Sequence, residues 1–304
     1  MHIIIIGASG LIGRALVHSL AQQHQLTLIG RSERRLKRTF GIDHTVLSLN
    51  KLSSQTLSTA DAVINLAGDN IGHSRWTASK KERILDSRVN TTTLLAQLAC
   101  QLGQNSPWII NASAIGIYGP NGASETPFIE TSALDEHPSD FLATVGRQWE
   151  AALAPVISAK IPCTILRFGV VLSCEGGMLK KLLPSFKCGL GAIIGDGRQM
   201  ISWISIKDLV GAIVFILENN IQGVCNLTAP TPVSQTEFTH TLARCLNRCS
   251  WMRIPTPMVG FLFGEMGQSL LLQGIAVAPD VLQQNGFTFQ YATLEEALKS
   301  LLQS

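Results

Sequence analysis

A glycine-rich segment near the start of the chain has the residue types and spacing of a phosphate-binding turn. Gly7, Gly10 and Gly13 follow an apolar run and precede a stretch of helical periodicity. The first glycine permits a tight turn, the second lets the backbone approach a pyrophosphate, and the third lets helix and strand pack closely. The N-terminus of that helix would direct free N–H groups at the phosphates. The predicted loop residues of a dinucleotide site are Gly7, Ser9, Gly10, Leu11, Ile12 and Gly13.

The residues that end the next expected strand indicate which dinucleotide the site would take. A site that prefers NAD usually carries an acidic residue there, about 20 residues further on, to bind the ribose 2′-hydroxyl. In this chain Gly30 is followed by Arg31 and Ser32. A guanidinium offers a planar fork of donors to a 2′-phosphate, and a serine hydroxyl can add one more. We therefore predict NADP as the cofactor, with NAD less favoured. For Lys37 and Arg38 a solvated basic helix face is a sufficient explanation.

Alternating strand and helix patterns in the first half must position these groups. Apolar runs such as Ile3–Ile6 and Trp108–Ile110 are unbroken, which is typical of strands buried on both faces of a parallel sheet. Stretches of helical periodicity separate them, as in βαβ units. The pattern predicts strands at 2–6, 26–29, 45–49, 62–66, 108–112 and 163–168, and helices at 11–22, 33–40, 79–102 and 139–154. The expected fold class is α/β, a Rossmann-type doubly wound parallel sheet.

The second half of the chain has a different pattern. From about Glu175 it becomes glycine-rich and irregular, and such loops often carry binding groups on a rigid scaffold. Helices are expected at 206–218, 234–247 and 294–302, and a short strand at 224–227. We predict an NAD(P)-binding domain over residues 1–170 and a smaller, mostly helical substrate-binding lobe over 171–304, with segments of the second half free to return to the sheet.

The composition excludes several other classes of protein. The 304 residues are 46% hydrophobic and 15% charged, and the net charge of +3 is too small for a nucleic-acid-binding face. The apolar runs are shorter than the about 20 residues that a membrane span needs. The seven cysteines and seven histidines show no metal-ligand spacing. We expect a cytoplasmic protein with reduced thiols, no metal, and no nucleic-acid or membrane partner.

Several motifs together resemble one protein family. The glycine triplet, the segment 61–68, Asn90, Ser113 and the pair Tyr118-Gly119 are similar to extended short-chain dehydrogenase/reductases of the sugar-nucleotide epimerase type. A narrower resemblance is to the atypical "epimerase family" branch, whose members carry names such as nucleoside-diphosphate-sugar epimerase or cell-division-inhibitor-like protein. The residues that carry it are Arg75-Trp76-Thr77, Ser87-Arg88, Trp149-Glu150, Gly189-Leu190-Gly191 and Ser202-Trp203-Ile204. The tail from Pro255 is similar to that branch's C-terminal domain of unknown function.

The resemblance implies cofactor binding but not the usual catalysis. The positions that it places beside the cofactor ribose or under the active site are Leu66, Ala67, Gly68 and Asn90. Typical members carry a Tyr-x-x-x-Lys dyad, in which the tyrosine exchanges the hydroxyl proton and the lysine lowers that tyrosine's pKa and binds the nicotinamide ribose. In the register set by Glu150, the two positions hold Leu142 and Gly146. Neither residue can perform either task.

Three other residues are candidates for the missing chemistry. Tyr118, one of only two tyrosines in the chain, is a candidate acid or base, and Ser113 is a candidate hydrogen-bond donor to a substrate oxygen. Arg147, one residue beyond the lysine position, could bind the ribose but could not lower a tyrosine pKa from there. The alternative is structural: Tyr118 packs under its loop and Ser113 caps the strand.

These observations predict an NADP(H)-dependent oxidoreductase or epimerase-like enzyme that lacks the usual dyad. Its substrate would be a small anionic molecule, nucleotide-sugar-like or a carbonyl compound, bound near lysines of the glycine-rich segment such as Lys180 and Lys181. The alternative is a non-catalytic NADP-binding sensor or partner-binding protein. The resemblance also implies a homodimer, with the helices at 79–102 and 139–154 paired across a two-fold axis.

Overall fold

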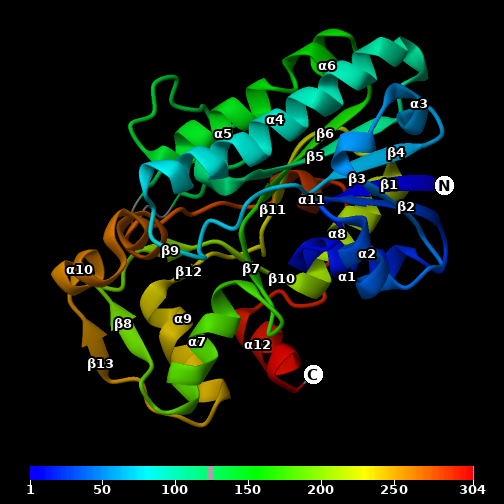
Figure 1. Cartoon of the computed structure of the whole chain (residues 1–304). Coiled ribbons are helices and arrows are strands. Elements are labelled where there is room, and N and C mark those ends of the chain that lie inside the picture. Colours follow the sequence, from blue (N-terminus) through cyan, green and yellow to red (C-terminus); the bar gives the residue numbers. More distant parts are fainter. Residues whose placement is uncertain (122–125, 304) are drawn as a thin grey trace.

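The computed structural model describes residues 1–121 and 126–303. At its centre lies a sheet of seven parallel strands in the order β11-β6-β5-β4-β1-β2-β3 (Figure 1). The strands are β1 (His2–Ile6), β2 (Gln25–Gly30), β3 (Thr45–Ser48), β4 (Ala62–Asn65), β5 (Trp108–Ala114), β6 (Cys163–Phe168) and β11 (Gly223–Leu227). Because the strand order reverses between β1 and β4, the carboxyl ends of these two strands flank a crevice. The predicted doubly wound α/β fold is confirmed.

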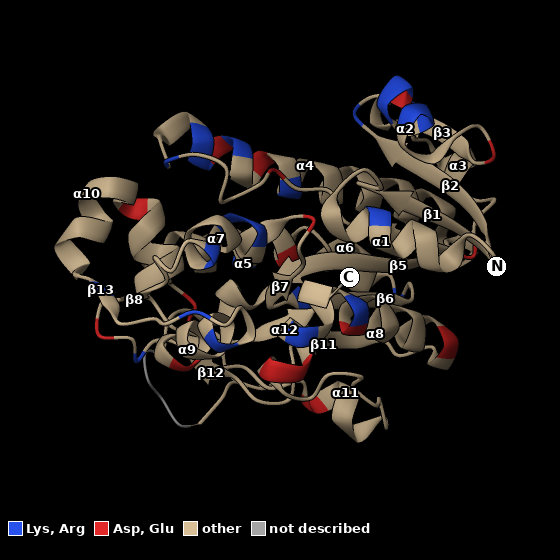
Figure 2. Cartoon of the chain, turned by 90° about the horizontal axis from the view of Figure 1, so that it is seen from below, with Lys and Arg blue, Asp and Glu red and all other residues tan. Residues whose placement is uncertain are grey.

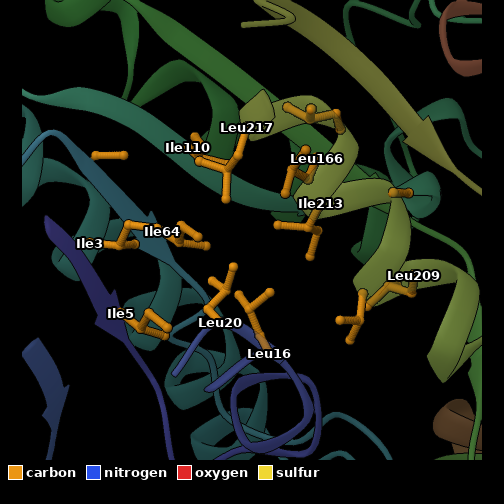
Figure 3. Close-up of a cluster of buried hydrophobic side chains, with 14 of the residues drawn as sticks. Ile3, Ile5, Leu16, Leu20, Ile64, Ile110, Leu166, Leu209, Ile213 and Leu217 are labelled. Atoms are coloured by element: carbon orange, nitrogen blue, oxygen red, sulfur yellow. The ribbon is translucent and has the colours of Figure 1, made fainter. Parts of the chain in front are cut away.

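Helices cover both faces of the sheet because each strand is apolar on both sides. Ile3 and Ile5 of β1 pack with Leu16 in one cluster, and Ile4 and Ile6 face the other way. Figure 3 shows the first cluster, where leucines and isoleucines of two helices lie over the strands. The helices on that face are α1 (Leu11–Leu20), α2 (Glu33–Phe40) and α8 (Ile206–Asn219), and those on the other are α3 (Ser54–Leu57), α4 (Ala78–Leu102), α5 (Phe141–Ala151) and α6 (Ala154–Ser158).

The single helix expected at 139–154 is two helices. Asp140 caps the first, since its carboxylate accepts the Ala143 N–H at 3.0 Å, so α5 begins at Phe141. The second, α6, carries Pro155 in its first turn, where a missing N–H and a fixed φ cost little. The proline therefore marks a new helix start rather than a kink within one helix.

A second core lies below the sheet in the view of Figure 1. Its helices are α7 (Gly177–Lys187), α9 (Gln235–Cys245) and α12 (Leu294–Gln303), and they pack with β7 (Val170–Leu172) and β10 (Trp203–Ser205). Trp203 and Phe238 are its largest fully buried side chains. The remaining elements are β8 (Ala192–Ile194), β9 (Met200–Ile201), β12 (Val233–Ser234), β13 (Met252–Ile254), α10 (Thr256–Gly267), α11 (Asp280–Gln284) and the short turns η1 (Leu49–Lys51), η2 (Gly103–Asn105), η3 (Ile115–Tyr118) and η4 (Gln268–Leu272).

The second half of the chain returns to the central sheet. The strand β11 pairs with β6, and α8 covers the face that α1 also covers. Residues 171–304 therefore do not all belong to the second core, as the prediction allowed, and the boundary at residue 170 stays a prediction.

The apolar stretch that follows Ile254 forms α10 and η4. The helix α10 is interrupted at Gly264, whose φ of +59° lies outside the helical region, and η4 follows. Within the described ranges, no helix combines the length and apolarity that crossing a bilayer requires.

The long helix α4 exposes charged side chains, among them Glu82, Arg83 and Asp86. Pairing of this helix across a two-fold axis stays a prediction.

Candidate functional site

The glycine loop leaves an open cradle of backbone between β1 and α1. Gly7 has a φ of +84°, and a Cβ atom there would lie 2.8 Å from the carbonyl group of Leu66. A Cβ atom on Gly13 would lie 2.6 Å from the carbonyl oxygens of Gly7 and Ala8, so only glycine lets α1 approach so closely. Gly10 caps α1 without a side chain. The free N–H groups of the first helical turn fit a pyrophosphate in this cradle.

The second core contacts the start of this cradle. Leu11 packs against Gly176, where a Cβ atom would lie 3.2 Å from the leucine side chain. Arg14 donates to the Ser9 carbonyl at 3.2 Å and pairs with Glu175 at 3.5 Å. The loop between β7 and α7 is thereby held against the N-terminus of α1. Ile12, the remaining loop candidate, packs partly buried against the core beneath.

Arg31 is exposed at the carboxyl end of β2, and within the described chain it has no recorded hydrogen bond or ion pair. Ser32 caps α2, because its hydroxyl accepts the Arg35 N–H at 3.3 Å. The nearest carboxylate in sequence, Glu33, pairs with Lys51 at 2.8 Å, and this interaction holds the pKa of Glu33 below its ordinary value. The Arg31 guanidinium is therefore not neutralised. Figure 2 shows the other basic residues gathered on α2.

The segment after β4 lies on the opposite side of β1. The Leu66 N–H donates to the Ile6 carbonyl at 2.8 Å, and the Ala67 N–H donates to the Asn65 side chain at 3.2 Å. Gly68 follows, exposed, with the guanidinium of Arg88 directly against it. These residues therefore reach the same crevice as Gly7, from the next strand.

A buried polar network fixes the ends of the strands behind the crevice. Asn65 donates to Asn111 at 2.7 Å and to Thr92 at 3.2 Å, and the Trp149 indole donates to Thr92 at 3.0 Å. This network connects β4, β5, α4 and α5. Asn90 takes no part in it, because its side chain is exposed on α4. The sequence analysis missed these buried residues, although an asparagine within each of two apolar strands was a visible signal.

A second buried network contains two of the candidate catalytic residues. Arg167 of β6 forms a two-pronged ion pair with Glu150 of α5, at 2.8 and 2.7 Å, and its side chain is only 4% exposed. Ser113 donates to the same carboxylate at 2.6 Å. Arg167 also donates to the Tyr118 hydroxyl at 2.8 Å, which in turn donates to Asn226 at 2.9 Å. Ser113 and Tyr118 are thus brought together through Arg167 and Glu150.

Tyr118 is 5% exposed and stacks on Phe128, with ring centroids 5.0 Å apart. Burial raises the pKa of its phenol, although Arg167 opposes the shift. Beyond Asn226, the Glu130 carboxylate accepts that residue's N–H at 2.8 Å, and burial raises the pKa of Glu130 too. The other Glu130 oxygen is buried and has no hydrogen-bond partner among the described residues. Arg147 lies half-buried on α5, outside this network.

The two dyad positions pack against the turn that carries Tyr118. A Cβ atom on Gly116 would lie 3.2 Å from Leu142, and one on Gly146 would lie 2.7 Å from Ile117. The turn η3 therefore occupies the space beside α5 into which a side chain at position 146 would extend.

A pocket of about 390 Å³ opens beside Tyr118. The residues that line it include three carboxylates, Asp135, Asp140 and Glu265, and among its described lining residues there is no lysine or arginine. The lysines predicted to bind an anionic substrate do not line this pocket. The Lys181 ammonium donates to the Gly72 carbonyl outside it. A larger depression of about 850 Å³ runs along α1 and includes the loop residue Leu11.

The wall of the smaller pocket is joined to the loop after β4. Arg75 donates to the carbonyls of Phe261 and Leu262, at 2.7 and 3.1 Å, where α10 is interrupted. Lys81 pairs with Glu265 at 2.6 Å. Arg75 and Lys81 therefore hold α10 against the start of α4.

The parallel sheet and its glycine cradle define a dinucleotide-binding fold of the Rossmann type. Comparison with known families agrees, since residues 3–227 match the NAD dependent epimerase/dehydratase family and residues 254–301 match a domain of unknown function, DUF1731. The chain belongs to the NAD dependent epimerase/dehydratase family.

Within that family, similar proteins are named epimerase family proteins, which confirms the narrower resemblance. Epimerase family protein MT2273 of Mycobacterium tuberculosis (strain CDC 1551 / Oshkosh) is 37% identical over 298 residues, which cover 97% of this chain and 95% of that protein. The crystal structure of human epimerase family protein SDR39U1 (isoform 2) with NADPH has a TM-score of 0.88 at 30% identity, with 100% of both chains covered. A nucleoside-diphosphate sugar epimerase from Corynebacterium glutamicum has a TM-score of 0.76 at 31% identity, covering 99% of this chain and 58% of that one.

Two helical glycines provide a matched test of the cradle. Gly13→Ala should lower the free energy of unfolding by about 1–3 kcal/mol, because the new methyl group overlaps two carbonyl oxygens. Gly211→Ala in α8 should raise it by up to about 1 kcal/mol, because a Cβ atom there meets only Phe287, at 3.8 Å, and alanine favours helix. Urea unfolding measures both. Equal effects of the two substitutions would contradict the close approach at Gly13.

The Arg167–Glu150 pair provides a second test. Arg167→Met should lower the free energy of unfolding by about 3–5 kcal/mol, because it leaves the Glu150 charge buried without its partner. The double variant Arg167→Met/Glu150→Met should be more stable than Arg167→Met alone, since no unpaired charge remains. If the loss of unfolding free energy in the double variant equals the sum of the losses in Arg167→Met and Glu150→Met, the pair is not coupled as described.

Proposed function

We propose that this protein binds NADP(H) and acts as an oxidoreductase or epimerase-like enzyme. The observation that carries the proposal is the unpaired Arg31 guanidinium at the end of β2, beside the glycine cradle. The cofactor would be held by the cradle residues Gly7, Ser9, Gly10, Leu11, Ile12 and Gly13, by Arg31 and Ser32, and by the segment Leu66–Gly68. When bound, it would supply or accept a hydride at its nicotinamide ring.

The choice of NADP over NAD rests on charge. A 2′-phosphate next to Arg31 would gain a charge-assisted hydrogen bond, whereas the 2′-hydroxyl of NAD would find no carboxylate from Glu33, which is bound to Lys51. The similarity to a human epimerase family protein solved with NADPH supports the same choice.

Proton transfer in the proposed enzyme does not use the Tyr-x-x-x-Lys dyad. Leu142 and Gly146 stand in those positions and pack against η3. Tyr118 is the proposed acid or base because it lines the acidic pocket. Ser113, whose hydroxyl donates to Glu150 in this structure, is the proposed donor to a substrate oxygen. Arg147 is the proposed replacement for the lysine as a ribose ligand.

The proposed substrate is a small molecule with a carbonyl or hydroxyl group. The carboxylates of Asp135 and Asp140 disfavour an anion inside the pocket beside Tyr118, whereas the charge of Glu265 is offset by Lys81. An anionic group of the substrate would therefore lie towards Lys181, near the loop after β4. A nucleotide-sugar-like substrate, a cytoplasmic location and a homodimer stay predictions.

A second function is favoured by one observation. The Tyr118 hydroxyl is engaged on both sides, by Arg167 and by Asn226, and burial raises the pKa of its phenol. A phenol held in this way contributes to structure without transferring a proton. On this alternative, the protein is a non-catalytic NADP-binding sensor or a partner-binding protein.

Arg31→Ala tests the cofactor preference. It should weaken NADPH binding by tenfold or more and leave NADH binding nearly unchanged, because a charged hydrogen bond is worth about 1.5–3 kcal/mol. Calorimetric titration measures both affinities. Arg34→Ala, which removes an exposed charge on α2, is the control and should change neither. An unchanged ratio of NADPH to NADH affinity would remove Arg31 from the site, and wild-type protein that binds neither nucleotide would overturn the proposal.

Tyr118→Phe distinguishes the two functions. With a panel of carbonyl and sugar-nucleotide substrates, the enzyme should lose about 100-fold or more of its NADPH turnover, as expected for loss of a general acid, while NADPH affinity is retained. Tyr291→Phe is the control, because that hydroxyl contacts Ser300 and Lys207 instead. Turnover that survives Tyr118→Phe would exclude the phenol as the acid, and no wild-type turnover across the panel would favour the sensor.

A further inference from the structure

Arg88 of α4 presents its guanidinium to the crevice at the end of β4. A Cβ atom on Gly68 would lie 3.1 Å from the Arg88 Cζ atom and 3.2 Å from Nη2. Gly68 does not have a positive φ, so its backbone does not require glycine. What requires a small residue is the guanidinium beside it, which any side chain at position 68 would cover.

The guanidinium is a largely buried cation that no carboxylate contacts directly, although the charge of Asp69 acts on it from further away. Its Nη1 atom donates to the carbonyls of Asp69 and Ile84, at 3.1 and 2.9 Å, and its Cζ atom lies 5.0 Å from the centroid of the Trp149 ring. Within the part of the chain that the structure describes, no carboxylate lies within ion-pair distance of it. The Asp69 carboxylate is bound instead to Lys80, at 2.7 Å. Burial accordingly lowers the pKa of Arg88 to about 10.

The position of Arg88 relative to the cradle indicates what would approach it. A dinucleotide bound at a switch point has its pyrophosphate at the first glycine loop and its adenosine ribose at the end of the second strand, here at Arg31. The other nucleotide must then extend to the opposite side of β1, over the end of β4, where Gly68 and Arg88 lie.

We propose that Arg88 binds the oxygens of the nicotinamide nucleotide, its ribose hydroxyls and phosphate, an assignment that rests on the NADP(H) binding proposed above. Nη1 is held by the two carbonyls and the guanidinium rests against the Trp149 ring, so the remaining donors are pre-oriented. Gly68 keeps them uncovered. Position 146 offers no ribose ligand, since Gly146 packs against Ile117, so Arg88 would share the ribose-binding task with Arg147.

The experiment compares two ligands that share only the adenosine half. Calorimetric titration of Arg88→Met with NADPH and with 2′,5′-ADP, which lacks the nicotinamide nucleotide, should show at least a tenfold loss of NADPH affinity and less than a twofold change for 2′,5′-ADP. Arg31→Ala should weaken both ligands. Gly68→Ala, which covers the guanidinium without removing it, should reproduce the selective loss.

Each other outcome has a defined meaning. Unchanged NADPH affinity in Arg88→Met, or an equal loss for both ligands, overturns the assignment, since equal losses indicate a structural role. If Arg88→Met does not fold, Arg88→Lys and Gly68→Ala carry the same comparison, and a non-selective effect in both overturns it. Wild-type protein that binds neither ligand contradicts NADP(H) binding itself, a result that cannot be confused with failure of the Arg88 assignment.

Discussion

The buried ion pair between Arg167 and Glu150 is the interaction on which the carboxyl edge of the sheet depends. It joins β6 to α5, and through Ser113 and Tyr118 it reaches β5, η3 and β11. Removing two charges from water is expensive, and the cost is offset only when the geometry is good and the remaining donors and acceptors are occupied. Here both hydrogen bonds between Arg167 and Glu150 are formed, and the guanidinium also donates to the Tyr118 hydroxyl. Ser113 and Tyr118, the candidates for catalysis, therefore also help to hold this edge together.

That commitment bears on how such a fold could carry out chemistry. A catalytic phenol needs a pKa near the working pH and access to substrate. The phenol of Tyr118 has a raised pKa and little exposure. The cradle at Gly7 and Gly13, in contrast, is formed by backbone and depends only on close contacts with neighbouring backbone. Cofactor binding and the proposed proton transfer are thus separable here. The first depends on local geometry, and the second depends on long-range contacts that this chain uses for stability.

The same division explains how much the sequence predicts. The strand Cys163–Phe168 and the helix Glu33–Phe40 are found at their predicted bounds, and the glycine loop is found between strand and helix, because apolar runs and glycine spacing are local signals. The turn at 115–118 is not predicted, since it depends on the missing side chain of Gly146, about 30 residues further on in the chain. Arg167 and Arg88 carry no local mark of their roles. A buried charge is interpretable only when its partner, or the lack of one, is known in space.

The hydrogen bonds between Arg75 and α10 can form only late in synthesis of the chain. The two partners are separated by 187 residues in sequence. At about 5–20 residues per second, a ribosome needs about 10–40 s to progress from one to the other. During that interval all residues of the glycine cradle have been synthesised, but α10, which lines the pocket beside Tyr118, has not. A nascent chain therefore passes through a stage in which the pocket beside Tyr118 lacks the wall that α10 later supplies, and that wall is completed late in biosynthesis.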